Sequence, residues 1–140
     1  MDSSNTGLMT TGQGLPEPPE NWEGSKPEWA FYTALRRLGK IPEEDFTYQS
    51  EQMGGRHDKG GAVLDFVFIN PPNLAVNVQG VYYHYEMGAD TKARDIMIRE
   101  AMAAQGITLI FVDEDDLEQD PLGVARNALQ FRDTSRLGGR

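Results

Sequence analysis

The segment that most restricts the fold spans residues 74–112, where an apolar run, a helical pattern and a second apolar run follow one another. The first run is "LAVNVQ" and the second is "ITLIFV", and each has the length of a short strand. The stretch between them, from Asp90 to Gly106, has apolar residues at helical spacing and ends on a glycine. Two strands joined by such a helix lie parallel, with a right-handed connection. The sequence therefore predicts an α/β fold.

Two more helices are predicted, one on each side of this unit in the sequence. Ser25 and Glu28 form the S-x-x-E pattern of a capping box, and Gly39 ends the helix that follows. The dipeptide Asp120-Pro121 begins the last helix, which also carries apolar residues at helical spacing. In the middle helix, five residues are predicted to line one side as its apolar face: Ala93, Met97, Glu100, Ala101 and Ala104.

Three strands are predicted between the first and the middle helix. "DFTYQSEQ" (45–52) alternates apolar and polar residues, and "AVLDFVFI" (62–69) is apolar on both faces except at Asp65. The glycine-bracketed turn "GGRHDKGG" joins these two strands, and "NPPN" forces a turn before the third. The order is helix, three strands in an antiparallel meander, helix, strand and helix. We therefore expect an αβββαβ core with a mixed four-stranded sheet flanked by helices.

A chain of 140 residues is expected to form one domain. Residues 1–24 are rich in Gly, Pro, Ser and Thr without an apolar period, so they are predicted to form a disordered polar tail, with Trp22 as a residue that could dock onto the domain. The domain itself is predicted to span residues 25–132. Residues 133–140 are predicted to be a frayed C-terminus.

The composition limits the classes of function. The chain has no cysteine, which excludes disulfides, thiolate metal sites and thiol nucleophiles. Its net charge of −9 disfavours general affinity for nucleic acid, although the basic residues gather in a few groups and leave a basic face open. No apolar run is long enough to span a membrane, and the first residues do not have the pattern of a signal peptide. We expect no membrane partner and a cytoplasmic or virion-associated protein that is not secreted.

The αβββαβ order, together with "GGAVLDFVFINPPNLAVNVQGVYYHY" and "ARDIMIREAMAAQGITLIFVDEDDL", resembles the PD-(D/E)XK nuclease superfamily. The similarity covers roughly residues 25–130, and it is closest to the branch of the very-short-patch-repair (Vsr)-like endonucleases. This resemblance implies a restriction-endonuclease-like fold and, if the protein is active, Mg²⁺-dependent cleavage of DNA. In that family, one carboxylate on the second strand and one on the third hold the metal, which polarises the phosphate and activates water.

Asp65 matches the first of these carboxylates and is the candidate metal ligand, whereas a local role at the strand end is its alternative. Asn77 stands where the resemblance implies a glutamate, and Gln79 stands at the last position of the motif. An amide oxygen can ligate Mg²⁺ but brings no negative charge, and asparagine cannot act as a general base. Glu28 could add a carboxylate from the first helix, with the capping box as its other role. We therefore expect Mg²⁺ to be weakly held or absent.

Two groups of residues are candidates for contact with nucleic acid or for proton transfer. His84, in "VYYHYEMG", could serve as a general acid or contact phosphate, and a hydrogen-bonded histidine in an aromatic cluster is the alternative. Arg56, His57 and Lys59 lie in the turn "GGRHDKGG", which could touch phosphates or could be a solvated turn.

Two acidic features of the sequence are better explained by local structure than by a metal site. Asp95 is expected to pair with Arg99 one helical turn later rather than to ligate metal. The carboxylates in the stretch Asp113–Asp116 could imitate a metal site, but they are expected to form a solvated loop and helix cap.

Two functions follow from these patterns. The first is a Mg²⁺-dependent DNA endonuclease with weak or lost cleavage, built around Asp65, Asn77, Gln79, Glu28 and His84. The second is a non-catalytic binding or assembly module on a nuclease fold, for example a viral structural component with protein partners. The substitution at Asn77 and the acidic balance favour the second, and Asp65 favours the first.

Overall fold

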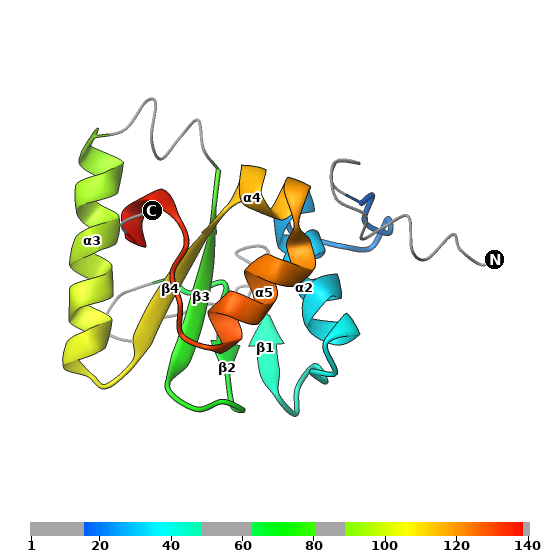
Figure 1. The fold of residues 1–140 in the computed structure, drawn as a ribbon, viewed down its shortest axis with the longest axis horizontal. Helices are drawn as coiled ribbons and strands as arrows, with labels where there is room; N and C mark the ends of the chain where they lie inside the picture. Colours follow the sequence, from blue (N-terminus) through cyan, green and yellow to red (C-terminus); the bar gives the residue numbers. More distant parts are fainter. Residues whose placement is uncertain (1–15, 49–62, 81–88, 139–140) are drawn as a thin grey trace.

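The computed structural model describes residues 16–48, 63–80 and 89–138 of the chain. Helices and strands follow one another in the order expected for an αβββαβ core, with one short helix, α4, that the sequence analysis did not predict (Figure 1). The elements are α2 (Lys26–Arg37), β1 (Phe46–Tyr48), β2 (Phe66–Phe68), β3 (Leu74–Gln79), α3 (Ala89–Ala104), β4 (Thr108–Asp113), α4 (Glu114–Gln119), α5 (Pro121–Leu129) and the 3-10 turn η3 (Arg136–Gly138).

The four strands form one mixed sheet in the order β1-β2-β3-β4. β1 pairs antiparallel with β2, and β2 pairs antiparallel with β3, with Phe66 opposite Val76. β3 and β4 are parallel, with Leu74 opposite Thr108 and Gln79 opposite Asp113. The α/β class, the antiparallel meander and the parallel pair are thus confirmed. β2 is shorter than predicted, since it begins at Phe66 instead of residue 62.

Helices cover both faces of the sheet, and each face has its own apolar core. The larger core lies between the sheet and α2, α4 and α5, and Phe31, Leu35, Phe66 and Val112 are among its fully or almost fully buried members. The smaller core lies under α3, which stands on the other side of the sheet in Figure 1. Its buried members in the described part of the chain are Leu64, Ala75, Met102, Leu109 and Phe111. None of the helices in the described ranges is long and apolar enough to cross a lipid bilayer.

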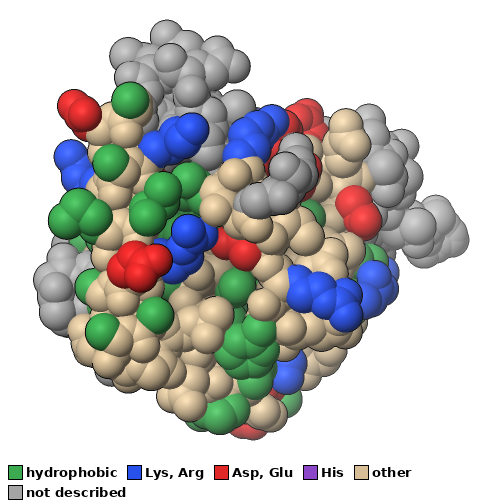
Figure 2. Space-filling model, turned by 60° about the vertical axis from the view of Figure 1, so that its left-hand side comes forward, with side chains coloured by type: hydrophobic (Ala, Val, Ile, Leu, Met, Phe, Trp, Pro, Cys, Tyr) green, Lys and Arg blue, Asp and Glu red, His purple; other side chains and the backbone are tan. Residues whose placement is uncertain are grey.

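α3 packs through a different side from the one predicted. Met102 is its buried residue, Ile98 is half-buried against the same core, and all five residues of the predicted face are exposed. Met97, at the centre of that face, keeps 69% of its surface exposed, and hydrophobic side chains lie on the surface on this side of the molecule (Figure 2). The prediction was wrong because α3 carries alanine, isoleucine and methionine all around its circumference, so periodicity does not single out one face.

The predicted disorder of the N-terminal tail and the predicted fraying of the C-terminus are both wrong for the residues that the structure describes. Residues 16–24 belong to the domain: Pro16 is buried, and the Trp22 ring lies 4.9 Å from Trp29 and 4.7 Å from Tyr48. Residues 1–15 lie outside the described residues. At the other end, residues 133–138 are packed rather than frayed, since Ser135 is fully buried and the segment bonds to β4.

The capping box at the start of α2 is formed as predicted. The Ser25 hydroxyl accepts a hydrogen bond from the Glu28 backbone N–H at 3.2 Å, and the Glu28 carboxylate accepts one from the Ser25 N–H at 3.0 Å. Replacement of Ser25 by alanine removes one half of this box. We expect Ser25→Ala to lower the free energy of unfolding by about 1 kcal/mol, measured by urea denaturation. Ser25→Asp, which keeps an acceptor at the cap, serves as the control and should retain wild-type stability.

Candidate functional site at the strand ends

Asp65, Asn77 and Gln79 lie where β2 begins and where β3 and β4 end. Alternation along β3 places Asn77 and Gln79 on the same face as Ala75, which belongs to the smaller core. Asp65 immediately precedes β2, and the register that pairs Phe66 with Val76 makes Asp65 and Asn77 the next pair along. The fold thus brings together the side chains that the nuclease resemblance selects on the second and third strands.

The Asn77 amide is hydrogen-bonded to the backbone at both of its ends. Its Oδ1 accepts a hydrogen bond from the Asp65 N–H at 2.8 Å, and its Nδ2 donates to the Val63 carbonyl at 3.1 Å. In return, the Asp65 Oδ2 accepts a hydrogen bond from the Val78 N–H at 2.9 Å. These three bonds join residues 63 and 65 to β3 through side chains, in the stretch where β2 was predicted to begin. Side-chain hydrogen bonds thus hold this stretch against β3 ahead of the regular strand pairing, which starts at Phe66.

Gln79 differs from Asn77 in its hydrogen bonding. Its side chain is only 2% exposed, and neither Nε2 nor Oε1 has a hydrogen-bond partner in the part of the chain that the structure describes. Buried amides are nearly always paired, because an unpaired one loses its bonds to water without replacement. Gln79 therefore carries no structural hydrogen bond comparable to those of Asn77, although it lies on the same face two residues later.

Glu28 is held away from this group by its own contacts. Its carboxylate receives the Ser25 N–H and also the Tyr48 hydroxyl, at 2.6 Å from the tyrosine oxygen. Within the described residues, it makes no hydrogen bond to Asp65, Asn77 or Gln79. α2 packs on the larger core, on the face opposite to Asn77. These contacts give Glu28 a local role, as a cap and as an acceptor for Tyr48.

Four predicted site residues have no described position. His84 falls in the range 81–88, and Arg56, His57 and Lys59 fall in the range 49–62, both of which lie outside the described residues. Their predicted roles toward nucleic acid stay predictions.

A second acidic group lies at the end of β4 and the start of α4. Ligand oxygens of Asp113, Asp115 and Asp116 lie within 4.8 Å of one another, so these residues could hold a metal ion. Asp113 is the N-cap residue of α4, as the expected helix cap implies, but it is fully buried rather than solvated. The prediction of a solvated loop was wrong at Asp113 because the C-terminal segment covers it.

Arg136 pairs with two carboxylates of this acidic group. Its guanidinium donates to Asp113 at 3.0 Å and to Asp115 at 2.7 Å, and its backbone N–H donates to the same Asp113 carboxylate at 3.0 Å. The hydrogen bond to Asp115 is the main cause that raises the pKa of Arg136 further above its ordinary value, with the charges of both carboxylates contributing. A metal ion at this place would have to compete with a guanidinium that is already bound.

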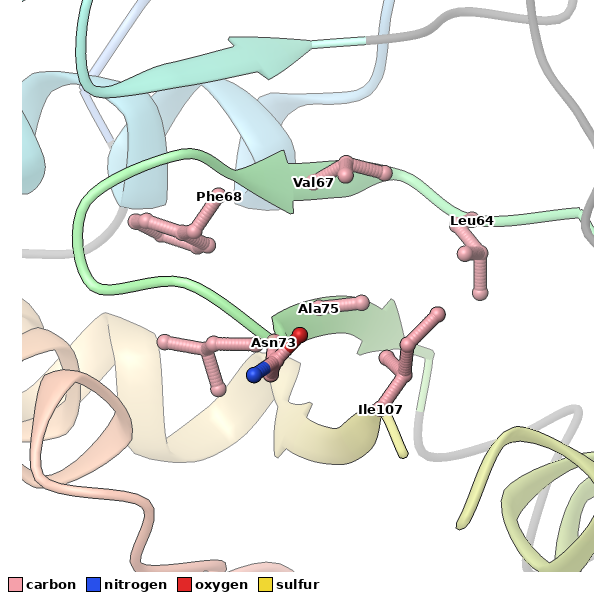
Figure 3. A pocket seen from close by; sticks show the side chains of 7 residues that line it. Leu64, Val67, Phe68, Asn73, Ala75 and Ile107 are labelled. Atoms are coloured by element: carbon pink, nitrogen blue, oxygen red, sulfur yellow. The ribbon is translucent and has the colours of Figure 1, made fainter. Parts of the chain in front are cut away.

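A small apolar cavity of about 140 Å³ lies near the turn between β2 and β3 (Figure 3). Leu64 and Ile107 point toward one another across it, and Val67 and Ala75 also line it. Among the described lining residues, Asn73 is the one with a polar side chain, and it adopts a positive φ of 65° in the turn. None of these described residues is titratable, so they offer no group for acid–base chemistry.

Comparisons with protein-family models, with curated proteins and with solved structures found no match to this chain.

Sequence reasoning missed two features of the described structure. The C-terminal residues Asp133, Ser135 and Arg136 bind back onto β4, although nothing in their composition distinguishes them from a polar tail. Trp22, Trp29, Tyr32 and Tyr48 form one aromatic cluster, with ring centroids between 4.7 and 6.3 Å apart for the interacting pairs. The sequence analysis named Trp22 as a residue that could dock onto the domain, and its ring contacts agree with that. The aromatic residues at helical spacing in α2 were a signal for its partners, but Tyr48 on β1 was not predictable from spacing.

Proposed function

We propose that this chain is a nuclease-like α/β domain that acts by binding a partner in an assembly rather than by cleaving DNA. The observation that carries this proposal is the double hydrogen bond of Asn77 to the backbone of residues 63 and 65. At the position where the resemblance implies a catalytic glutamate, the chain has a residue whose donor and acceptor both connect two strands.

The electrostatics of the strand ends support the same proposal. Mg²⁺ is bound through oxygen ligands and depends on carboxylates for its charge balance. Asp65 is the one carboxylate of the Asp65–Asn77–Gln79 group, and one of its oxygens already accepts the Val78 N–H at 2.9 Å. Asn77 cannot take a proton from water. The group therefore lacks both the second anionic ligand and a general base that metal-dependent hydrolysis of a phosphodiester uses.

The second candidate function is the metal-dependent endonuclease itself, and the observation that favours it is Gln79. The Gln79 amide is buried, stands at the last position of the family motif and has no hydrogen-bond partner among the described residues. It offers a carbonyl oxygen to a ligand on the face of β3 that also carries Asn77. This candidate needs a metal at Asp65 that tolerates two amide neighbours.

A cleavage assay separates the two candidates. We expect the wild-type chain, incubated with supercoiled plasmid or branched DNA and an excess of Mg²⁺ or Mn²⁺, to cleave no faster than Asp65→Asn, because the site cannot bind the metal through two carboxylates. The Asp65→Asn variant has a side chain of nearly the same size, and it controls for contaminating nuclease. Metal-dependent cleavage by the wild type that is lost in Asp65→Asn would establish the endonuclease and refute the binding proposal.

A further inference from the structure

A cavity of about 230 Å³ is lined by residues of the N-terminal segment, of α2, of the connection after α2 and of β1. Three aromatic residues line it, namely Trp22, Tyr32 and Tyr48, and two acidic residues, Glu23 and Glu43, are also part of the lining. Its volume is below the roughly 300 Å³ at which sites for drug-sized ligands begin. A space of this size accommodates the end of one side chain or a small headgroup.

The aromatic rings of this cavity are held in fixed and different orientations. Trp22 stacks on Tyr48 with 20° between the ring planes, and it meets Tyr32 edge-on at 62°. Trp29 supports Trp22 from outside the cavity, with 4.9 Å between ring centroids. The Tyr48 hydroxyl is fixed by its 2.6 Å hydrogen bond to Glu28. A ligand in the cavity therefore meets preformed ring surfaces rather than mobile side chains.

Among the described residues that line the cavity, the charged ones are acidic. None of them is Lys or Arg, and Glu43 is an exposed member of the lining. Glu43 has a positive φ of 74°, and its backbone N–H donates to the Phe46 carbonyl at 2.7 Å, so the residue is anchored where it stands. Among the described residues, its carboxylate has no salt bridge or hydrogen-bond partner. Aromatic faces and carboxylates attract the same class of ligand, because both present negative charge to it.

We propose that this cavity binds an organic cation, the guanidinium or ammonium end of an arginine or lysine side chain presented by a protein partner. Such a group fits the volume, lies over the ring faces and pairs with Glu43. The inference gives a partner chemistry to the proposed binding function and rests on it in that respect, but the cavity is lined by none of the residues of the strand-end group. The cleavage assay described above and the binding test below can therefore refute their two proposals independently of one another.

The test is a titration of the full chain with the peptide acetyl-Gly-Arg-Gly-amide and with its neutral citrulline analogue, followed by the ¹H–¹⁵N signals of the two tryptophan indoles. We expect the arginine peptide to shift the Trp22 indole signal and to bind about tenfold more tightly than the citrulline peptide, because only the former is charged. Glu43→Gln should lower the affinity of the chain for the arginine peptide by about two- to fivefold. Glu44→Gln removes the same charge from an exposed neighbour that does not line the cavity, and it should leave the affinity unchanged.

Equal affinity for the two peptides, or an equal effect of Glu43→Gln and Glu44→Gln, would overturn the proposal, since binding would then reflect the general acidity of the chain. A titration with tetramethylammonium identifies the source of the cation. Binding much weaker than that of the arginine peptide supports a side chain of a protein partner. Binding as tight as that of the arginine peptide overturns the protein partner and assigns the cavity to small free ammonium ions.

Discussion

Replacement of Asn77 by aspartate is expected to lower the free energy of unfolding by roughly 3 kcal/mol at neutral pH. The new carboxylate can still accept the Asp65 N–H, but it cannot donate to the Val63 carbonyl as the amide does at 3.1 Å. It also places a second negative charge beside Asp65, whose carboxylate is fixed on the Val78 N–H. The loss therefore combines an unpaired backbone carbonyl with repulsion between two carboxylates. Urea denaturation at pH 7 measures it.

The pH dependence of this variant separates the two causes. Repulsion from Asp65 holds the pKa of the introduced carboxyl above its value in the unfolded chain. The destabilisation is therefore largest above that pKa and shrinks as the pH falls through it, where the protonated carboxyl also regains a donor. The matched control Asn77→Ala loses both hydrogen bonds without adding charge, so its deficit relative to wild type should not shrink in the same pH range.

The stability of Asn77→Asp, with and without divalent metal, can contradict this interpretation of Asn77. If Asn77→Asp matches the stability of the wild type, or if Mg²⁺ or Mn²⁺ restores it to that level, the site accepts a second carboxylate as a metal ligand. Asn77 would then be a degenerate catalytic position rather than a connector between strands. We expect added metal to leave the stability of the wild type unchanged and the deficit of the variant largely in place.

Truncation of the chain before Asp133 is expected to have the larger effect, a loss of about 3–5 kcal/mol. The Asp133 carboxylate accepts the Phe111 N–H at 2.9 Å on the free edge of β4, and Arg136 neutralises the fully buried Asp113. Without residues 133–140, the Phe111 N–H loses the Asp133 carboxylate, and the buried Asp113 carboxylate loses the two hydrogen bonds from Arg136. Thermal and urea denaturation of the truncated chain measure the loss.

Self-association through the exposed edge of the sheet is a second measurable effect of this truncation. β4 is the last strand in the sheet order, and unpaired edge strands join to other chains. The truncated chain should therefore self-associate in sedimentation experiments at concentrations where the full chain does not. A chain that ends at Gly138 keeps all of these contacts and serves as the control. Wild-type stability and the same sedimentation behaviour after truncation before Asp133 would mean that the C-terminal segment contributes nothing to the edge.

Strand and helix order was predictable from the sequence because it depends on short-range patterns. The apolar runs at 74–79 and 107–112 and the helix between them define the parallel pair, and the capping box places the start of α2 within one residue. The packing side of α3 was not predictable, because Ile96, Met97, Ile98 and Met102 surround the helix and only the tertiary structure selects Met102 for burial.

The candidate site was predictable in its location and not in its bonding. A resemblance between motifs brought Asp65, Asn77 and Gln79 together, and the register of β2 and β3 brings Asp65 and Asn77 to adjacent positions. Whether an amide faces a ligand or a backbone carbonyl depends on how two strands diverge over a few residues. The bond between Asp133 and Phe111, which are 22 residues apart, has no periodic signal at all.

The two cores differ in size, and this difference has a consequence for how the molecule fluctuates. Within the described ranges, five buried residues form the core between α3 and the sheet, whereas fourteen form the core shared by α2, α4 and α5. Elements with little buried contact detach at a lower free energy than the whole fold requires. We therefore expect α3 to open as a separate cooperative unit while the sheet and the opposite helical layer stay intact. Such an opening would expose the α3 face of the sheet, where Asn77 and Gln79 lie.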